Sequence, residues 1–292
     1  MTLPPIKALG TVWHIELFET CRDHSALRNS IVDWLEVFES RYSRFRSDSW
    51  LSTLNQNGVF INPNHQFVDL LTQAREYYSA TEGVFNIAVG EQLTQSGYDA
   101  DYSFTAATKI SSVPDLPDIL DVKRDTILLK SGSLDLGGIG KGYAIDKLAD
   151  FLKEEHGLRF FLINGGGDMY ATSDNDKPIT ITLAHPDDQS LAIGTLDLQN
   201  VGFAASSPRL RTWRDPQTGS VYNHLLTKNN IASYVVAPTT TAADVWATVS
   251  CLNQDVQVPP NVHQLLIDRL GQIAKDTFVY LENKESYNLY KK

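Results

Sequence analysis

Apolar residues recur along this chain with two spacings, one typical of strands and one typical of helices. Residues 11–18 alternate apolar and polar positions, as a half-buried strand does. Further strands are predicted at residues 126–130, 160–164, 179–183 and 192–198, with a terminal strand at 277–281. Helices are predicted where apolar residues return every three or four positions, at residues 25–42, 67–78, 145–152, 243–252 and 262–270.

Strands and helices do not alternate strictly along the chain, which favours an α+β fold with mixed or antiparallel sheets and packed helices. Residues 94–118 are rich in Ser, Thr, Asp and Pro, so we predict a small insertion there rather than a domain boundary. Length alone allows one large domain or two modest ones, and we expect residues 1–292 to form a single domain.

Composition narrows the class of protein. With 292 residues and 42% hydrophobic residues, the chain indicates a globular protein with a substantial core. A net charge of −10 argues against nucleic-acid binding, and no run approaches the roughly 18 apolar residues of a membrane span. Cys21 and Cys251 lie far apart, so we expect neither a disulfide framework nor a cysteine metal site. Because no signal segment precedes residue 11, we expect a cytoplasmic protein.

A glycine-rich segment, Leu134-Asp-Leu-Gly-Gly-Ile-Gly-Lys-Gly-Tyr-Ala-Ile-Asp146, lies between a predicted strand and a predicted helix. Glycines let a backbone approach a ligand closely, and the N-terminus of the following helix offers free N–H groups to an anion. The spacing fits neither a Walker A loop nor G-x-G-x-x-G. Two readings stay open: a phosphate or anion site, or a tight turn that packs a strand on a helix.

Three further groups of residues could carry chemistry. Asp244 and Thr248 are four positions apart, so on a helix they share one face and could hold Mg²⁺, although solvated or capping roles are common for such residues. His224 lies between an apolar run and a polar loop, where either a general base or a partly buried strand histidine would fit. The run Gly165-Gly-Gly167 before Asp168 indicates a close backbone approach or a tight turn between core strands.

Taken together, these segments resemble the FAD:protein FMN transferase family, the ApbE-type flavin transferases. The resemblance is carried in order by Leu9-Gly-Thr11, Phe45-Arg-Ser-Asp-Ser-Trp-Leu-Ser-Thr-Leu-Asn55, Gly83-Val-Phe-Asn-Ile-Ala-Val-Gly90, Asp135-Leu-Gly-Gly-Ile-Gly-Lys-Gly-Tyr-Ala-Ile-Asp146, Asn164-Gly-Gly-Gly-Asp168 and Ala243-Asp-Val-Trp-Ala-Thr248. It implies the ApbE-type α+β fold, with FAD as the donor, Mg²⁺ as the metal, and an acceptor flavoprotein as the partner. It also implies transfer of FMN to a Thr or Ser hydroxyl of the acceptor, with release of AMP.

The resemblance also implies roles for particular residues. Asp244 and Thr248 match the metal-binding carboxylate and hydroxyl, and Gly138 matches the position whose carbonyl binds the same Mg²⁺. His224 matches the histidine of the family pattern His-x-Ile-Asp-Pro-x-Thr-Gly and is the catalytic candidate. The positions that match flavin-nucleotide contacts are Leu9, Phe45, Val84, Phe85, Asn86, Asp135, Lys141 and Leu226.

The chain departs from the family pattern in two loops. After His224, where Asp-Pro-x-Thr-Gly is expected, it has Thr227-Lys-Asn-Asn230. Upstream, the usual Thr-Ser-Gly is Ser206-Ser-Pro208, followed by Arg209 and Leu210 in place of acidic and tyrosine residues. Asn86 replaces an expected aspartate, and Phe45 replaces a stacking tyrosine while keeping a ring face. These departures leave two alternatives open: an FAD pyrophosphatase that yields FMN and AMP, and a non-catalytic FAD-binding protein.

Overall fold

The computed structural model describes residues 1–174, 177–188, 190–278 and 287–289. The chain forms two compact units. The first unit contains Met1–Glu36, Lys141–Leu210 and Asn229–Lys292, and the second contains Val37–Gly140 and Arg211–Lys228. The division falls inside helix α1 (His24–Tyr42) and at the start of helix α6 (Gly140–His156).

The first unit is built on an eight-stranded sheet in which every neighbouring pair is antiparallel. A three-stranded antiparallel sheet, in the order β16-β9-β8, accompanies it. The strands of the large sheet, in spatial order, are β1 (Ile6–Ala8), β2 (Thr11–Leu17), β6 (Phe161–Gly165), β7 (Asp168–Thr172), β10 (Val201–Ser206), β13 (Ala232–Ala237), β14 (His263–Ile267) and β15 (Ile273–Asp276). Those of the small sheet are β8 (Ile179–Ala184), β9 (Ala192–Leu198) and β16 (Tyr287–Leu289).

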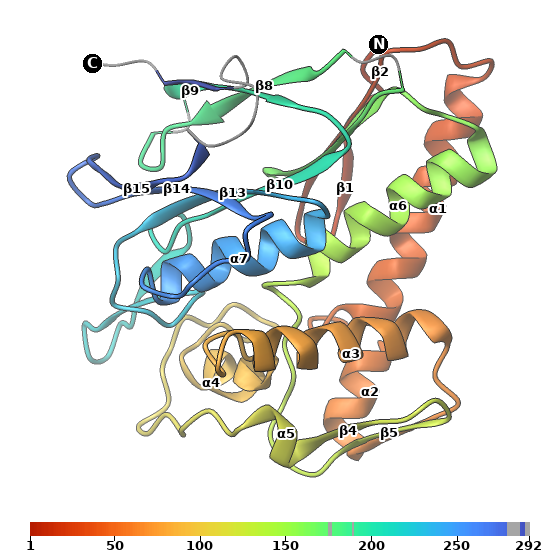
Figure 1. Ribbon diagram of the computed structural model, residues 1–292. Coiled ribbons are helices and arrows are strands. Elements are labelled where there is room, and N and C mark those ends of the chain that lie inside the picture. The colour runs from red at the N-terminus through yellow and green to blue at the C-terminus, as the bar shows by residue number, and fades with distance from the viewer. Residues whose placement is uncertain (175–176, 189, 279–286, 290–292) are drawn as a thin grey trace. The chain divides into compact units, whose positions relative to one another are not determined.

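Successive side chains along a strand point to opposite faces of the large sheet, and each face is covered by different elements. Phe203 on β10 belongs to a buried apolar cluster with Ile181 and Leu196 of the small sheet. Its neighbour Gly202 points the other way, toward the N-terminus of helix α7 (Thr240–Leu252), which packs on β10 and β13. Figure 1 shows α7 lying along these strands with α6 beside it. The sheet is therefore covered by helices on one face and by the small sheet on the other.

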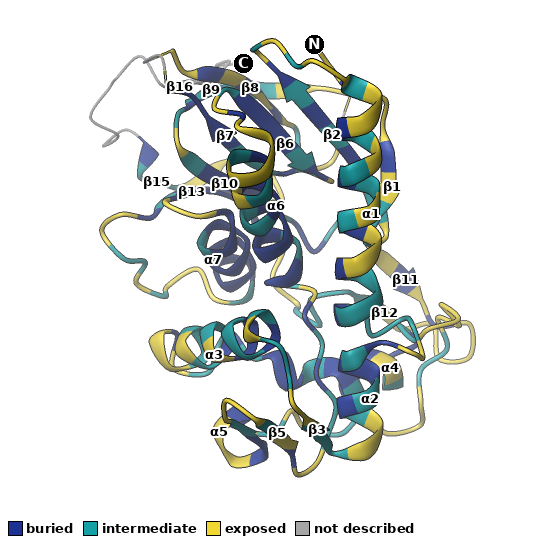
Figure 2. Cartoon of the chain, turned by 90° about the vertical axis from the view of Figure 1, so that its right-hand side faces the viewer, coloured by how far each residue is buried: buried dark blue, intermediate teal, exposed yellow. Residues whose placement is uncertain are grey.

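The central strands of this sheet are buried on both faces, and their sequence shows no clear period as a result. All six residues of β13 are buried, and Figure 2 shows β13 and α7 in the colour of buried residues. The helix that we predicted at residues 262–270 is wrong, because residues 263–267 form strand β14, with Gln264, Leu265, Leu266 and Ile267 all buried. An apolar run that is covered on both sides satisfies a helical spacing by chance.

The second unit carries short helices and two small antiparallel sheets. One sheet has the order β3-β5-β4, and the other is the hairpin β11–β12. The strands are β3 (Val59–Ile61), β4 (Leu120–Val122), β5 (Thr126–Leu129), β11 (Thr212–Arg214) and β12 (Val221–Asn223). The helices are α2 (Trp50–Asn57), α3 (His65–Ala80), the 3-10 helix η1 (Ile87–Val89), α4 (Gly90–Gln95) and α5 (Leu116–Ile119).

The predicted α+β class with antiparallel sheets is confirmed. Most amphipathic elements are predicted to within two or three residues. The strands that were missed include β1, β3, β4, β7, β10, β11, β12, β13 and β15. The predicted terminal strand is wrong at Thr277 and Phe278, and its remaining residues, 279–281, lie outside the described part of the chain. Both cysteines are free thiols. Among the described helices, none combines the length and the apolar character needed to cross a bilayer.

Candidate functional site

The residues predicted to form the site are divided between the two units. Leu9, Lys141, Asp244 and Thr248 belong to the first unit. The others belong to the second unit, namely Phe45, Val84, Phe85, Asn86, Asp135, Gly138, His224 and Leu226.

In the first unit, the N-termini of α6 and α7 are held together by carboxylates. The α7 residues Thr240 and Thr241 donate their backbone N–H groups to Asp146 of α6, both at 2.8 Å. In return, Gly142 near the start of α6 donates its N–H to Asp244 Oδ2 at 3.1 Å. A helix leaves its first four N–H groups without partners inside the helix, so each carboxylate satisfies donors of the other helix.

The glycine-rich segment makes this packing possible. Gly142 lies so close to α7 that a Cβ there would meet the carbonyl oxygen of Thr240 at 2.5 Å. From the sheet side, a Cβ on Gly202 would meet Thr240 N at 2.2 Å. At Gly142, therefore, the backbone of α6 closely approaches the backbone of α7 and not a ligand. This supports the prediction that the glycine packs two elements of the protein together.

Three charged side chains gather beside these helix starts. Lys141 Nζ pairs with the buried Asp168 carboxylate, and it lies 3.6 Å from Asp244 Oδ2. Burial raises the pKa of Asp244 to about 7; Lys141 acts to lower that pKa and Asp168 acts to raise it further. Sequence reasoning noted Asp168 only as the end of a glycine run that forms a close backbone approach or a tight turn, and the contact with Lys141, 27 positions away, was missed.

This cluster of three fits a divalent cation. When both carboxylates are ionised, they and the ammonium carry a net charge of −1, and the two carboxylates are 2% and 5% exposed. A buried excess of negative charge is stabilised by a bound cation, and carboxylate and hydroxyl oxygens are ligands that Mg²⁺ accepts. Thr248, one turn along α7 from Asp244, is also buried, so its hydroxyl lies on the same helix face. In the described residues, no three His, Cys, Asp or Glu side chains form a ready-made metal group, so water or substrate oxygens would complete the shell.

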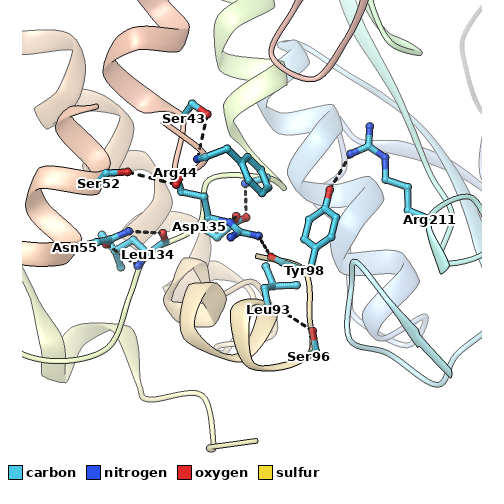
Figure 3. A network of polar contacts seen from close by, with 12 residues as sticks. Ser43, Arg44, Ser52, Asn55, Leu93, Ser96, Tyr98, Leu134, Asp135 and Arg211 are labelled. Atoms are coloured by element: carbon cyan, nitrogen blue, oxygen red, sulfur yellow. Dashed lines mark hydrogen bonds and ion pairs between the residues drawn. The ribbon is translucent and has the colours of Figure 1, made fainter. Parts of the chain in front are cut away.

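In the second unit, Asp135 is the centre of a polar network. Its carboxylate pairs with Arg44 and accepts the backbone N–H of Gly137 at 2.7 Å. Arg44 also donates to the carbonyl of Tyr98 at 2.7 Å, and the Tyr98 hydroxyl lies 3.1 Å from Arg211 Nη1. Figure 3 shows these side chains converging from four segments of the chain. The Asp135 carboxylate is thus fixed in place, with its side chain 11% exposed.

An aromatic cluster surrounds the predicted nucleotide contact Phe45. Its ring stacks on Tyr102 at a centroid distance of 5.4 Å and meets the edge of Tyr98 at 5.7 Å. The Arg44 guanidinium lies over the same ring, 4.2 Å from its centroid. Tyr98 in turn stacks on Trp213 at 5.4 Å. Phe45, which replaces the expected tyrosine, is therefore in contact with two tyrosines from residues 94–118. Sequence reasoning did not find this contribution.

The segment after Gly83 has roles inside the protein. Asn86 caps η1 by accepting the N–H of Ala88 and donates its amide to the carbonyl of Pro114 at 2.9 Å. Phe85 is 3% exposed and packs near Tyr77. Val84 is half-buried. The Asn86 side chain is already engaged at both ends, which supports a positioning role for this run.

The histidine loop differs from our expectation in one respect. The pattern Asp-Pro-x-Thr-Gly is present in the chain, at Asp215-Pro-Gln-Thr-Gly219, before His224 rather than after it. The histidine of the family pattern stands three positions before the aspartate, where this chain has Thr212. The prediction that Thr227-Lys-Asn-Asn230 replaces this pattern is therefore wrong, and so is the match of His224 to its histidine.

The β11–β12 hairpin brings His224 close to that position. Thr212 pairs with Asn223 across the hairpin, and His224 donates its backbone N–H to the carbonyl of Arg211 at 3.2 Å. Leu226 follows in a turn with φ of 51°. His224 lies directly after β12, and its role as general base stays a prediction from its side-chain chemistry.

Leu9 lies at the tip of the β1–β2 hairpin, where Ala8 pairs with Thr11. Leu9 and Gly10 both have positive φ, 50° and 69°. A two-residue hairpin turn needs such angles to match the right-handed twist of the strands that it joins. A leucine in this backbone region is strained, and such outliers are found often at functional positions. The strain supports the predicted ligand role of Leu9.

Comparison with known proteins identifies relatives over most of the chain. The family model "ApbE family" matches residues 9–263. The FAD:protein FMN transferases of Klebsiella pneumoniae and Escherichia coli K12 are each 24% identical over 270 residues, covering 83% of this chain and 75% of the relative. The ApbE protein of Thermotoga maritima has the same fold, with a TM-score of 0.76 at 19% identity over 95% of this chain and 97% of that chain. The flavin transferase ApbE of Vibrio cholerae also has this fold, with a TM-score of 0.70 at 20% identity over 99% of this chain and 96% of that chain. This chain therefore belongs to the ApbE family.

Proposed function

We propose that this protein is a Mg²⁺-dependent transferase that moves FMN from FAD onto a Thr or Ser hydroxyl of an acceptor protein and releases AMP. The observation that carries the proposal is the buried cluster of Lys141, Asp168 and Asp244 at the starts of α6 and α7. The names of the curated relatives, FAD:protein FMN transferase, support the same reaction.

In the first unit, Asp244 and Thr248 would hold the metal ion, and the family resemblance also assigns the carbonyl of Gly138 to it. When bound, Mg²⁺ would neutralise charge on the FAD pyrophosphate and polarise the phosphorus that is attacked. Lys141, held by Asp168, adds a second positive charge for the phosphates. In the second unit, Phe45 and the fixed carboxylate of Asp135 would contact the flavin nucleotide. The remaining predicted contacts are Leu9 in the first unit and Val84, Phe85, Asn86 and Leu226 in the second.

In the proposed transfer, His224 acts as the general base. It takes the proton from the acceptor hydroxyl, whose oxygen forms a bond to the phosphorus beside the riboflavin half of FAD. The bond from that phosphorus to the bridging oxygen breaks, and AMP leaves with the oxygen. FMN stays on the acceptor as a phosphoester, so all atoms are accounted for.

An FAD pyrophosphatase is the second candidate. Thr212 stands at the histidine position of the family pattern, so the residue that activates an acceptor hydroxyl is altered. If water attacked the same phosphorus, the products would be free FMN and AMP. A protein that binds FAD without turnover is the third alternative, and it would use the same binding residues.

One experiment separates the three alternatives. The protein is incubated with FAD, Mg²⁺ and candidate acceptor proteins, and AMP, free FMN and acceptor mass are followed together. AMP with an FMN adduct supports the transferase, whereas AMP with an equal amount of free FMN supports the pyrophosphatase. Quenching of FAD fluorescence without AMP supports simple binding, and Asp244→Asn serves as the control for metal-dependent turnover.

A further inference from the structure

Two aromatic side chains of the second unit are exposed and lie next to each other. Tyr102 is 44% exposed and Phe104 is 38% exposed, and both belong to the connection between α4 and α5. Their ring centroids are 6.1 Å apart, and the ring planes are tilted by 50°. Exposed apolar groups that lie together often mark a binding site, and both rings are accessible to a ligand.

Each of the two rings is supported by a less exposed ring. Tyr102 stacks on the half-buried Phe45 with an interplanar angle of 15°. Phe104 packs on Trp213 at a centroid distance of 5.7 Å. Trp213 is buried and donates its indole N–H to the carbonyl of Ser96 at 2.8 Å. The exposed rings are therefore held from within the unit, and the exposed part of each ring lies away from this support.

The backbone that carries the two rings is strained and is held by hydrogen bonds. Tyr102 and Phe104 have φ of 51° and 52°, a region that bulky residues rarely adopt. The Asp99 carboxylate accepts the N–H of Ser103 at 2.9 Å. Phe104 donates its own N–H to the carbonyl of Gly97 at 2.9 Å. Strained positions that the surrounding structure maintains cluster at ligand-binding sites.

Contacts connect these rings to the predicted flavin-nucleotide residues Phe45 and Asp135. Arg44 pairs with the Asp135 carboxylate and lies over the Phe45 ring. Phe45 in turn stacks on Tyr102. The series of contacts from Asp135 to Tyr102 lies entirely within the second unit. Tyr102 therefore offers an exposed ring directly beside the predicted contacts with the flavin nucleotide.

The isoalloxazine ring of FAD matches these two side chains in its chemistry. It is a planar, electron-poor system of three fused rings, whereas the phenol ring of Tyr102 is electron-rich, so the two stack favourably. One end of isoalloxazine is an apolar dimethylbenzene ring, which suits a contact with Phe104. Adenine is smaller and has no apolar end, so it fits this pair of side chains less well.

We propose that Tyr102 stacks on the isoalloxazine ring of FAD and that Phe104 packs against its dimethylbenzene end. Phe45, at the position of the family's stacking tyrosine, then supports Tyr102 and does not carry the flavin alone. Identifying the ligand as FAD rests on the proposed function. Both residues bind the flavin and take no part in proton transfer or bond cleavage.

The test measures flavin binding to the full chain with Mg²⁺ present and needs neither an acceptor nor turnover. FMN carries isoalloxazine without adenine, and AMP carries adenine without isoalloxazine. Tyr102→Leu should raise the Kd for FMN roughly 5- to 100-fold, as the loss of an aromatic stacking contact does. The Kd for AMP should not change. Both constants are measured by isothermal titration calorimetry.

Matched variants separate stacking from a general effect on the structure. Tyr102→Phe keeps a ring and should bind FMN nearly as the wild type does. Bound FMN should nevertheless fluoresce more strongly in Tyr102→Phe, because a stacked tyrosine donates an electron to the excited flavin and phenylalanine does not. Phe104→Leu keeps an apolar contact and should weaken FMN binding less than Tyr102→Leu. Phe18→Leu removes a ring with 41% exposure from the first unit and should leave FMN binding unchanged.

Several outcomes would overturn the proposal. They are the absence of FMN binding to the wild type, unchanged FMN affinity in Tyr102→Leu, an equal loss in Phe18→Leu, and a greater loss of affinity for AMP than for FMN. Flavin binding is measured independently of AMP release. Weaker FMN binding by Tyr102→Leu in a protein that forms neither AMP nor an adduct would keep the stacking site and reject the transferase. FMN transfer with unchanged flavin affinity in Tyr102→Leu would keep the transferase and reject the stacking site.

Discussion

Asp146 and Asp244 each bind the N-terminus of the helix on which the other residue lies. Asp146, on α6, accepts from Thr240 and Thr241 at the start of α7, and Asp244, on α7, accepts from Gly142 near the start of α6. The two helices are thereby fixed in register at the place where Lys141, Asp168 and Asp244 meet. The positive ends of both helix dipoles also lie beside these carboxylates.

Replacing Asp146 should lower the stability of the protein. Asp146→Asn keeps one acceptor oxygen but loses the second, which receives both the N–H and the hydroxyl of Thr241, the latter at 2.6 Å. We expect a loss of about 1–3 kcal/mol in the free energy of unfolding, measured by urea denaturation. Asp150→Asn, at an exposed site on the same helix, is the control and should change little. Equal losses in the two variants would show that the inter-helix bonds are unimportant.

Two glycines in the first turn of α6 allow a sharper test of the packing. Gly142→Ala would place a Cβ at 2.5–2.8 Å from backbone atoms of Thr240 and Thr241, so we expect destabilisation of roughly 1–3 kcal/mol in thermal or urea unfolding. Gly140→Ala meets only the Leu136 Cβ at 3.5 Å, an ordinary contact, and should be neutral or stabilise by up to about 1 kcal/mol. Similar stabilities of the two variants would contradict the close approach of α6 to α7.

Sequence reasoning found long elements that present one apolar face, but it missed β13 and misassigned β14, which are covered on both faces. Helix α3 was predicted because Phe67, Leu70, Leu71 and Ala74 repeat with a helical period and are buried. Strand β13, Ala-Ser-Tyr-Val-Val-Ala, is buried at every position, so no period was visible. The same burial of β14 produced a false helix at residues 262–270.

In the site, relations between residues close in sequence could be predicted, and contacts between residues far apart in sequence could not. The shared face of Asp244 and Thr248 follows from a spacing of four residues, so it could be predicted. The pairs Lys141–Asp168 and Arg44–Asp135 join positions 27 and 91 residues apart. No local rule connects such residues, because their contact depends on the tertiary fold. The role of Asp168 could therefore be recognised only in the fold.

The metal assignment predicts a specific loss in Asp244→Asn. Removing this carboxylate should lower Mg²⁺-dependent AMP formation from FAD by roughly 100-fold or more, since Lewis-acid assistance contributes several kcal/mol. Folding should persist, because Lys141 retains Asp168 as its partner. AMP release is measured across a Mg²⁺ titration, with Asp174→Asn, an exposed carboxylate, as the control. Undiminished turnover of Asp244→Asn at limiting Mg²⁺ would reject the assignment.

His224 and Thr212 make competing predictions for the proton transfer. His224→Ala should leave FAD binding unchanged, by fluorescence titration, and slow FMN transfer by roughly 10²–10⁴-fold, as expected for a lost general base. Thr212→Val keeps the size of the side chain on the opposite strand and should have a much smaller effect. If Thr212→Val alone abolished transfer, the assignment of His224 as the base would be rejected, and Thr212 would be a residue that positions the acceptor.

Asp215 should make the stability of the second unit depend on pH in the acid range. The buried carboxylate accepts backbone N–H groups from Thr218 and Ala106, both at 2.8 Å, and from Gln217 at 2.6 Å, and these bonds lower its pKa. The pKa of Asp215 is lower in the folded protein than in the unfolded chain. At a pH between these two values the unfolded chain binds more protons, so stability falls as the pH falls. The contribution is complete above the unfolded value of about 4 and is lost as the pH falls through the folded pKa. Asp215→Asn should therefore have a lower Tm than the wild type at pH 6, and the difference should shrink below pH 4. Asp101→Asn, at an exposed carboxylate, should show neither effect, and a Tm difference for Asp215→Asn that stays constant from pH 6 to pH 3 would contradict the assignment.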